Sequence, residues 1–127
     1  MGYMRHHAIL VTSDEVLIQK VHAKAREIFC DPFRWSIHCN TERMVSPVMC
    51  GVVNDEFSFF IAPDGSKEGW PDSDTGNALR AEFRDYLESL RYADGSSSIK
   101  WAEVQYGDDE GETCITADGD AARRQAT

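Results

Sequence analysis

Residues 57–70 read FSFFIAPDGSKEGW, and this stretch decides how we expect the chain to fold. Apolar side chains run as far as Ala62, which predicts a strand, and Pro63 to Gly65 then stop it. Proline presets φ and glycine accepts a positive φ, so Pro-Asp-Gly predicts a tight turn. The loop that follows is polar except for Trp70. We therefore expect a strand that ends in a loop with one large aromatic side chain.

Further strands and two helices are expected on either side of this stretch. Patterns of apolar residues bounded by turn residues predict strands over residues 7–12, 45–53, 56–62, 99–106 and 112–117. The polar pair Asn54-Asp55 makes a hairpin of the second and third strands. Between the strands, apolar residues at helical spacing predict two helices, with stripes at Leu17, Val21, Ala25 and Ile28, and at Leu79, Phe83, Tyr86, Leu87 and Leu90.

Each expected helix has a candidate capping residue. Ser13 is placed to cap the first, with acidic residues in the first turn, and Asp31-Pro32 ends it. Ser73 or Asp74 is placed to cap the second. Trp70 then lies between the sheet and the cap of the second helix, which leaves two uses for it. It could be a lid that closes the open face of the sheet, or an anchor at the edge of an acidic binding surface.

The element order β-α-β-β-α-β-β indicates an α+β fold. It is the ferredoxin-like β-α-β-β-α-β arrangement with an added C-terminal hairpin strand. Two helices would cover one face of an antiparallel sheet and leave the other face open. Alternation along the strands could place Phe60 and Trp101 on the open face as an apolar patch. Alternatively, loops that carry Trp35 and Trp70 could fold over that face and bury it.

Length and composition indicate one globular domain over residues 1–127. The chain is 42% hydrophobic and 28% charged, which are ordinary globular values. We expect an ordered core over about residues 6–117 and a polar tail over residues 118–127. No apolar run is long enough to span a membrane. The apolar run near the N-terminus, residues 8–11, is too short for a signal peptide, so we expect a cytoplasmic protein.

The four cysteines predict free thiols rather than disulfides or a metal site. They are scattered and form no Cys-x-x-Cys motif, and a chain of this length does not need disulfides for stability. A zinc site from Cys30, His38, Cys39 and Cys50 is conceivable, but the spacing matches no known zinc motif. The sequence therefore predicts no metal and no cofactor.

Charge is distributed unevenly along the chain. Residues 1–53 carry six basic and five acidic side chains, a net charge of +1, whereas residues 54–127 carry seven and seventeen, a net charge of −10. An acidic surface repels phosphate backbones, so direct binding of nucleic acid is not expected. Basic protein surfaces would be attracted, in a way that salt weakens. The simpler interpretation is that acidic residues keep a small domain soluble.

No arrangement of residues predicts a catalytic site. The four histidines are scattered, and the glycines form no phosphate-binding loop. Asp108, Asp109, Glu110 and Glu112 cluster in the turn of the last hairpin, where exposed carboxylates would be solvated rather than catalytic. The sequence leaves open whether the protein is an enzyme, with a lean towards a protein that is not.

Three segments carry a resemblance to a protein family. The segments VSPVMCGVVNDEFSFFIAPDGSKEGW, YADGSSS and WAEVQYGDDEGE resemble small uncharacterised proteins encoded by bacteriophages and prophages of proteobacteria. The resemblance covers most of residues 7–117. It implies a bacterial host cell and an accessory role during infection or lysogeny, and it implies no catalytic residues.

Two functional hypotheses follow. The first is a non-enzymatic module that binds a host or phage protein through its acidic part, the Trp70 loop and the last hairpin; one form of it is a DNA mimic. The candidate partner-binding residues are Trp70, Asp72, Asp74, Trp101, Asp108, Asp109 and Glu110. The second is a small enzyme or ligand-binding domain that works as a face-to-face homodimer, with a pocket lined by Phe60, Trp101 and either His38 or Cys50.

Overall fold

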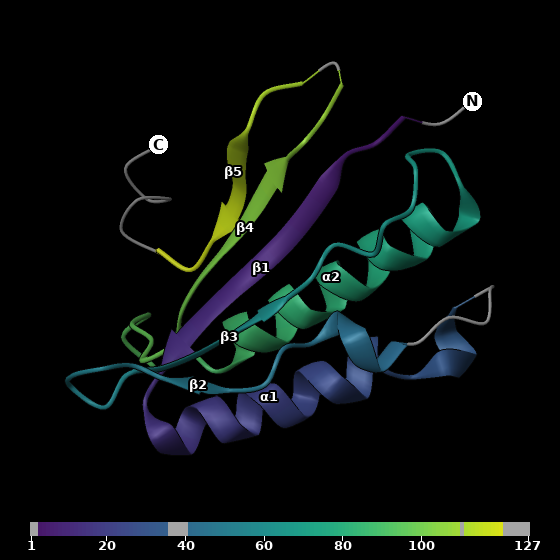
Figure 1. Cartoon of the computed structure of the whole chain (residues 1–127). Coiled ribbons are helices and arrows are strands. Elements are labelled where there is room, and N and C mark those ends of the chain that lie inside the picture. Colours follow the sequence, from purple (N-terminus) through teal and green to yellow (C-terminus); the bar gives the residue numbers. More distant parts are fainter. Residues whose placement is uncertain (1–2, 36–40, 110, 121–127) are drawn as a thin grey trace.

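The structure, a computed structural model, describes residues 3–35, 41–109 and 111–120. Two α-helices pack on one side of a five-stranded sheet (Figure 1). The elements in chain order are β1 (His6–Ser13), α1 (Glu15–Phe29), two short 3-10 turns η1 (Pro32–Arg34) and η2 (Thr41–Met44), β2 (Met49–Cys50), β3 (Phe57–Ile61), α2 (Pro71–Ser89), β4 (Lys100–Tyr106) and β5 (Cys114–Asp118).

The sheet has the strand order β2-β3-β1-β4-β5, and every neighbouring pair is antiparallel. The first strand is central because β3 and β4, each connected through a helix, pair with its two edges. The first four strands are therefore arranged as in a ferredoxin-like fold, and β5 extends the sheet beyond β4. The α+β fold expected from the element order is confirmed.

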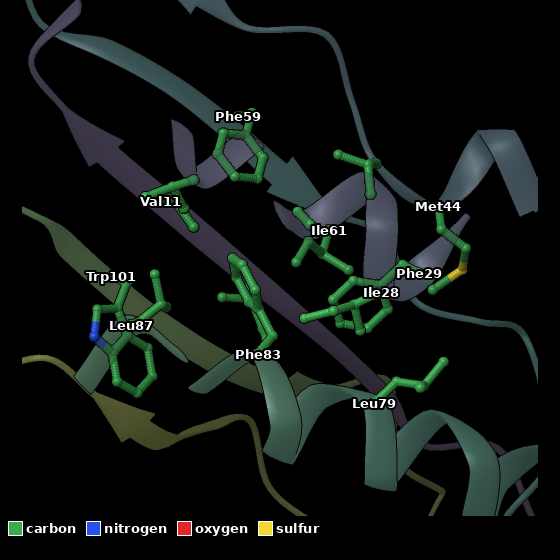
Figure 2. Packing of buried hydrophobic residues seen from close by; sticks show 14 of the residues in the cluster. Val11, Ile28, Phe29, Met44, Phe59, Ile61, Leu79, Phe83, Leu87 and Trp101 are labelled. Carbon is green, nitrogen blue, oxygen red and sulfur yellow. The ribbon is translucent and has the colours of Figure 1, made fainter. Parts of the chain in front are cut away.

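The core lies between the sheet and the two helices. Figure 2 shows Phe83 and Leu87 of α2, Phe29 of α1 and Phe59 of β3 within one buried cluster. The rings of Phe29 and Phe83 meet edge to face, with centroids 5.8 Å apart. Both predicted helix stripes face this cluster, although Leu17, Tyr86 and Leu90 at their margins are only partly buried. Burial of these apolar side chains is the main force that holds the helices on the sheet.

The second strand is much shorter than the predicted 45–53. Only Met49–Cys50 pairs with β3 as a strand, and Val45 forms a single isolated bridge with Ile61. The hairpin itself is confirmed: Asn54 and Asp55 both have positive φ, of 63° and 51°. Two successive residues of that kind match the twist of the adjoining strands.

Neither predicted helix cap is correct. The α1 cap is Asp14, whose Oδ1 accepts the Leu17 N–H at 2.8 Å, while the Ser13 hydroxyl donates to the Ser98 carbonyl. The second helix begins at Pro71, earlier than predicted, and its cap residue Trp70 makes no side-chain capping bond. Proline is favoured at the first helical position because that position needs no N–H donor. Ser13 therefore lies at the end of β1, before the cap of α1, whereas Ser73 and Asp74 lie inside the first turn of α2.

The expectation that Trp101 points to the open face is wrong. Trp101 is 8% exposed and belongs to the helix-side core, with Ile99 and Glu103 buried on the same side of β4. The residues that face away from the helices are Lys100, Ala102, Val104 and Tyr106, as their pairing with β1 requires. Phe60 does face outward, as expected, and is 40% exposed.

The predicted boundary of the polar tail is also shifted. Asp118 pairs with Ala102 within β5, and the Gly119 N–H donates to the Trp101 carbonyl at 3.0 Å. The ordered sheet therefore continues past residue 117. Neither α-helix of the described residues has the length and apolar character needed to cross a membrane.

Candidate functional site

The loop between β3 and α2 is held at both ends by backbone hydrogen bonds. Where it leaves the sheet, the Ala62 N–H donates to the Met44 carbonyl at 2.7 Å. Further along, the Glu68 N–H donates to the Tyr3 carbonyl at 2.9 Å, and Lys67 forms a β-bridge with Met4. Gly65 and Gly69 have φ of 81° and 91°, so each turn of the loop uses a conformation that glycine accepts without strain. The loop is thus fixed to two other segments of the chain.

Asp64 organises the turn at the start of this loop. Its Oδ1 accepts hydrogen bonds from the Ser66 N–H at 2.8 Å and the Ser66 hydroxyl at 2.5 Å, and its Oδ2 pairs with Nη1 of Arg80 at 3.1 Å. The Arg80 side chain is 4% exposed, and its Nη2 donates to Asn77 at 2.7 Å. A buried arginine and carboxylate stabilise the structure only as a pair, because each charge alone would be desolvated without compensation.

Gly76 lets the loop approach α2 closely enough to form this pair. A methyl group at Gly76 would overlap the Asp64 carboxylate and come within 3.2 Å of the Arg80 Nη1. Glycine within a helix costs stability relative to alanine, so its presence here needs a reason. The close approach of the Asp64 side chain to the helix surface is that reason.

Trp70 lines a cavity of about 250 Å³ between this loop, η2 and the start of α2. Trp35 and Met44 form apolar parts of the wall, and Arg43 supplies a positive charge. The remaining lining residues are Thr41, Pro63, Asp64, Gly65, Ser66 and Asp72. The Trp70 side chain is 47% exposed, with the Lys67 ammonium 5.6 Å from its ring centroid. The cavity can hold one aromatic or aliphatic group flanked by polar groups.

Trp70 is therefore not a lid over the open face of the sheet. The cavity that it lines includes Thr41, whose hydroxyl donates to Cys30 just after α1, and Asp72 in α2. Trp35, expected as another cover for the open face, lies in the helix-side core and donates from its indole N–H to Phe29. The open face keeps exposed apolar side chains, so the predicted covering by these loops is wrong.

A network of charged groups lies near this loop on the helix side of the sheet. Nε2 of His7 is 3.7 Å from Oε1 of Glu68, and its buried Nδ1 has no hydrogen-bond partner among the described residues. Burial lowers the pKa of His7, and the positive charge of Arg80 lowers it further. Nearby, Glu103 accepts a hydrogen bond from Nη1 of Arg84 at 2.5 Å and another from the Thr116 hydroxyl at 2.8 Å.

The candidate partner-binding residues do not form one exposed acidic surface. Trp70, Asp74 and Asp109 are exposed. Asp72 and Trp101 are buried, which leaves Trp101 unable to contact a partner in this structure. Glu110 lies outside the described residues.

Asp108 is also not the solvated carboxylate that the turn predicts. Its side chain is fully buried against Nε of Arg5. Residues 3–5 run from the Trp70 loop to the last hairpin, because Met4 bridges Lys67 and Arg5 pairs with Asp108. The loop and the hairpin turn are thus connected by one segment, although they do not share a cavity.

Sequence reasoning missed Arg43, Arg80 and Gly76. Arg80 looks like an exposed helix residue because it interrupts the apolar stripe, and its partner Asp64 is far away in sequence. A signal was present in Gly76, since glycine inside a helical pattern indicates a close approach of another segment. No comparable signal points to Arg43, which reaches the cavity from η2.

The cysteines give no metal site in the part of the chain that the structure describes. Cys30, Cys50 and Cys114 are free thiols, and no cluster of three or more ligating side chains occurs among the described residues. His38 and Cys39, considered as zinc ligands, and His38 as a pocket residue, lie outside those residues. Burial raises the pKa of the Cys30 thiol, which keeps it protonated and poorly reactive.

Comparisons with known proteins add little to this description. No protein-family model matches the sequence, and no curated protein matches it. A solved structure that is similar is the guanylyl cyclase domain of the RhoGC fusion protein from the aquatic fungus Blastocladiella emersonii, at 12% identity and a TM-score of 0.31, with 92% of this chain and 71% of that chain covered. A score this low carries no argument about function.

Proposed function

We propose that this chain is a small accessory protein of bacteriophage or prophage type that binds another protein in the cytoplasm of the bacterial host, without catalysing a reaction. The observation that carries the proposal is Trp70, a large aromatic side chain left half exposed on a loop with fixed ends. Exposed tryptophan on a rigid loop is typical of the residues that dominate protein–protein binding energies.

The surroundings of Trp70 support a protein partner. The cavity of about 250 Å³ beside the ring can accept a single side chain of a partner, and Trp70 would pack against it. Asp74, one turn into α2, is exposed and adds negative charge at the rim. Because residues 54–127 carry a net charge of −10, we expect the partner to present a basic surface.

The test is affinity capture from a host-cell lysate, with the wild-type protein and with Trp70→Ala compared at low and high salt. We expect a bound protein that is released at high salt, and a loss of affinity of about 30-fold in Trp70→Ala, which is the lower limit of a hot spot. The fold of each variant is checked by circular dichroism. The captured protein is then purified and its affinity measured directly.

Tyr92→Ala is the matched control. Tyr92 is an exposed aromatic residue in the loop that follows the C-terminal end of α2, whereas Trp70 precedes the N-terminal end. Its replacement should leave the affinity unchanged. The proposal is wrong if no partner is captured, or if Trp70→Ala binds as tightly as the wild-type protein.

A further inference from the structure

The face of the sheet opposite the helices is apolar and uncovered. Leu10 at its centre is 51% exposed, although it lies in the central strand β1. Pairing with β1 and its neighbours places apolar residues of all five strands on the same face. They are Ala8, which is itself buried, Met49, Phe60, Ala102, Val104, Tyr106 and Ile115. A contiguous apolar surface of this kind marks an interaction site.

This open face is nearly free of charge. Its strand residues include only two fully charged side chains among those described, Lys100 and Asp118, and one is basic while the other is acidic. The whole chain, by contrast, has a net charge of −9. Two copies that met through most other surfaces would repel each other, but through this face they would not. The charge distribution therefore favours a neutral, apolar occupant.

The same face carries both a large and a small side chain next to Leu10. Leu10 pairs with Phe60 on one edge and with Ala102 on the other, so the three lie in one row across the sheet. Phe60 is 40% exposed, whereas the small side chain of Ala102 lies at the rim of a hollow of about 480 Å³ that Ile115 also lines. The rest of that hollow is formed by the loop after α2, the ends of β4 and β5, and charged side chains that include Arg91 and Asp120. Phe60 and Ala102 lie on opposite sides of Leu10, so the face carries a large side chain on one side of its centre and a small one on the other.

We infer that the open face binds a second copy of this chain, with a two-fold axis that runs parallel to β1 above Leu10. Rotation about that axis places Leu10 against the Leu10 of the other copy. It exchanges the two edges of β1, so each large Phe60 side chain lies opposite the small Ala102 side chain of the other copy. Because a two-fold interface uses one patch twice, a face of this kind closes into a dimer and does not extend into a filament.

The size of the face sets the strength of the dimer. With strands about 4.8 Å apart and up to about 25 Å long, the face has an area of about 500 Å² per copy. A dimer would then bury about 1,000 Å² in total, which is near the lower limit for specific interfaces. We therefore expect a reversible dimer that dissociates on dilution in the micromolar range. This inference does not depend on the protein-binding role of Trp70.

Sedimentation velocity over a dilution series tests the inference. We expect the wild-type protein to change from dimer to monomer on dilution. Leu10→Lys and Leu10→Asp should each be monomeric, since like charges would meet at the axis, while an equal mixture of the two variants should recover the dimer. Phe33→Lys is the control: Phe33 is 96% exposed in η1, away from this face, and the variant should dimerise like the wild-type protein.

Ala102→Arg gives an independent test, because it replaces the small side chain that would lie opposite Phe60 and leaves Leu10 unchanged. This variant should also be monomeric, with circular dichroism to confirm folding. The inference is overturned if the wild-type protein stays monomeric at the highest concentration, or if Leu10→Lys still dimerises. It is also overturned if the mixture of the two Leu10 variants stays monomeric, because residue 10 then does not meet its own copy.

Discussion

The two helices cover the same face of the sheet but bury different kinds of side chain. In α1, every buried residue is apolar, and the helix begins with a side-chain cap from Asp14. In α2, apolar burial dominates only from Leu79 onward, and the first half also buries Asp72, Gly76 and Arg80. Its cap residue, Trp70, makes no side-chain capping bond. One helix thus serves stability alone, whereas the start of the other holds a loop in place at a cost in stability.

This difference teaches where a binding site is to be sought. Ordinary rules of helix formation explain α1 completely, from the cap to the apolar stripe. The first half of α2 departs from them with an interior glycine and a buried arginine. Residues that weaken a helix are kept where they serve another purpose. Here, the glycine and the buried arginine both support the loop that carries Trp70.

Arg80→Ala should have the largest effect on stability, because it removes the buried charged pair that distinguishes α2 from α1. It leaves the Asp64 carboxylate buried without its partner, so the free energy of unfolding should fall by about 3–5 kcal/mol. Chemical denaturation measures the change. A double variant, Asp64→Asn with Arg80→Met, should recover part of the loss, because no isolated charge then remains. If Arg80→Ala costs less than a surface substitution, the buried pair is not important for α2.

Gly76→Ala should destabilise α2, although alanine is the better helix former. The new methyl group would displace the Asp64 carboxylate, and overpacking of this kind costs about 1–3 kcal/mol. Ala78→Gly, at an exposed position two residues further, is the control and should cost about 1 kcal/mol from helix propensity alone. Gly76→Ala and Ala78→Gly, which are opposite changes in the same helix, would then both lower the midpoint temperature of thermal unfolding. A stabilised Gly76→Ala would contradict the close approach.

Asp14→Ala should affect α1 more than the loss of the Trp70 side chain affects the start of α2. Removal of the cap bond to Leu17 should lower the free energy of unfolding by about 1 kcal/mol. Trp70→Ala removes no capping bond, so its effect on stability should be smaller. Denaturation of the two variants side by side measures the difference. A larger loss in Trp70→Ala would show that its ring is mainly structural.

The smallest effect should be a pH dependence that originates from His7. Its pKa is lowered in the folded protein, so the unfolded chain takes up a proton first as the pH falls. Stability should therefore be unaffected above about pH 6.5 and decline below it, and His7→Gln should flatten the decline. Glu68→Gln should steepen it, because the Glu68 charge favours protonated His7. If stability declines as steeply with falling pH in His7→Gln as in the wild-type protein, the pH dependence originates from other titratable groups.

The element order could be predicted from the sequence, because the strands and helices follow local patterns. The side of β4 that faces the helices could not be predicted, because apolar residues lie on both sides of the strand. Trp101 lies on one side, and Ala102 and Val104 lie on the other. Glu103 lies on the same side of the strand as Trp101, and a charged residue is not expected to face a core. It is buried because Arg84 and Thr116 provide partners, and neither partner is close to it in sequence.

The site was predicted only in part for the same reason. Trp70 stood out because a large aromatic residue in a polar loop is a local feature. The cavity beside it is made by Trp35, Arg43 and Met44, which come from a segment far back in the chain. The bridge between Val45 and Ile61, and hydrogen bonds that join Met44 to Ala62 and Ser46 to Phe60, bring that segment to the loop. No pattern of residue spacing in the sequence indicates that these two segments come into contact.

The central position of β1 has a consequence for the synthesis of the protein. His6 pairs with Tyr106, so β1 leaves the ribosome long before β4, the strand that pairs with one of its edges. Contacts between such distant parts of a chain form slowly, because a long loop must be ordered first. During translation, the edge of β1 that pairs with β4 therefore stays unpaired until β4 has been made, and an unpaired strand edge makes a nascent chain prone to aggregate.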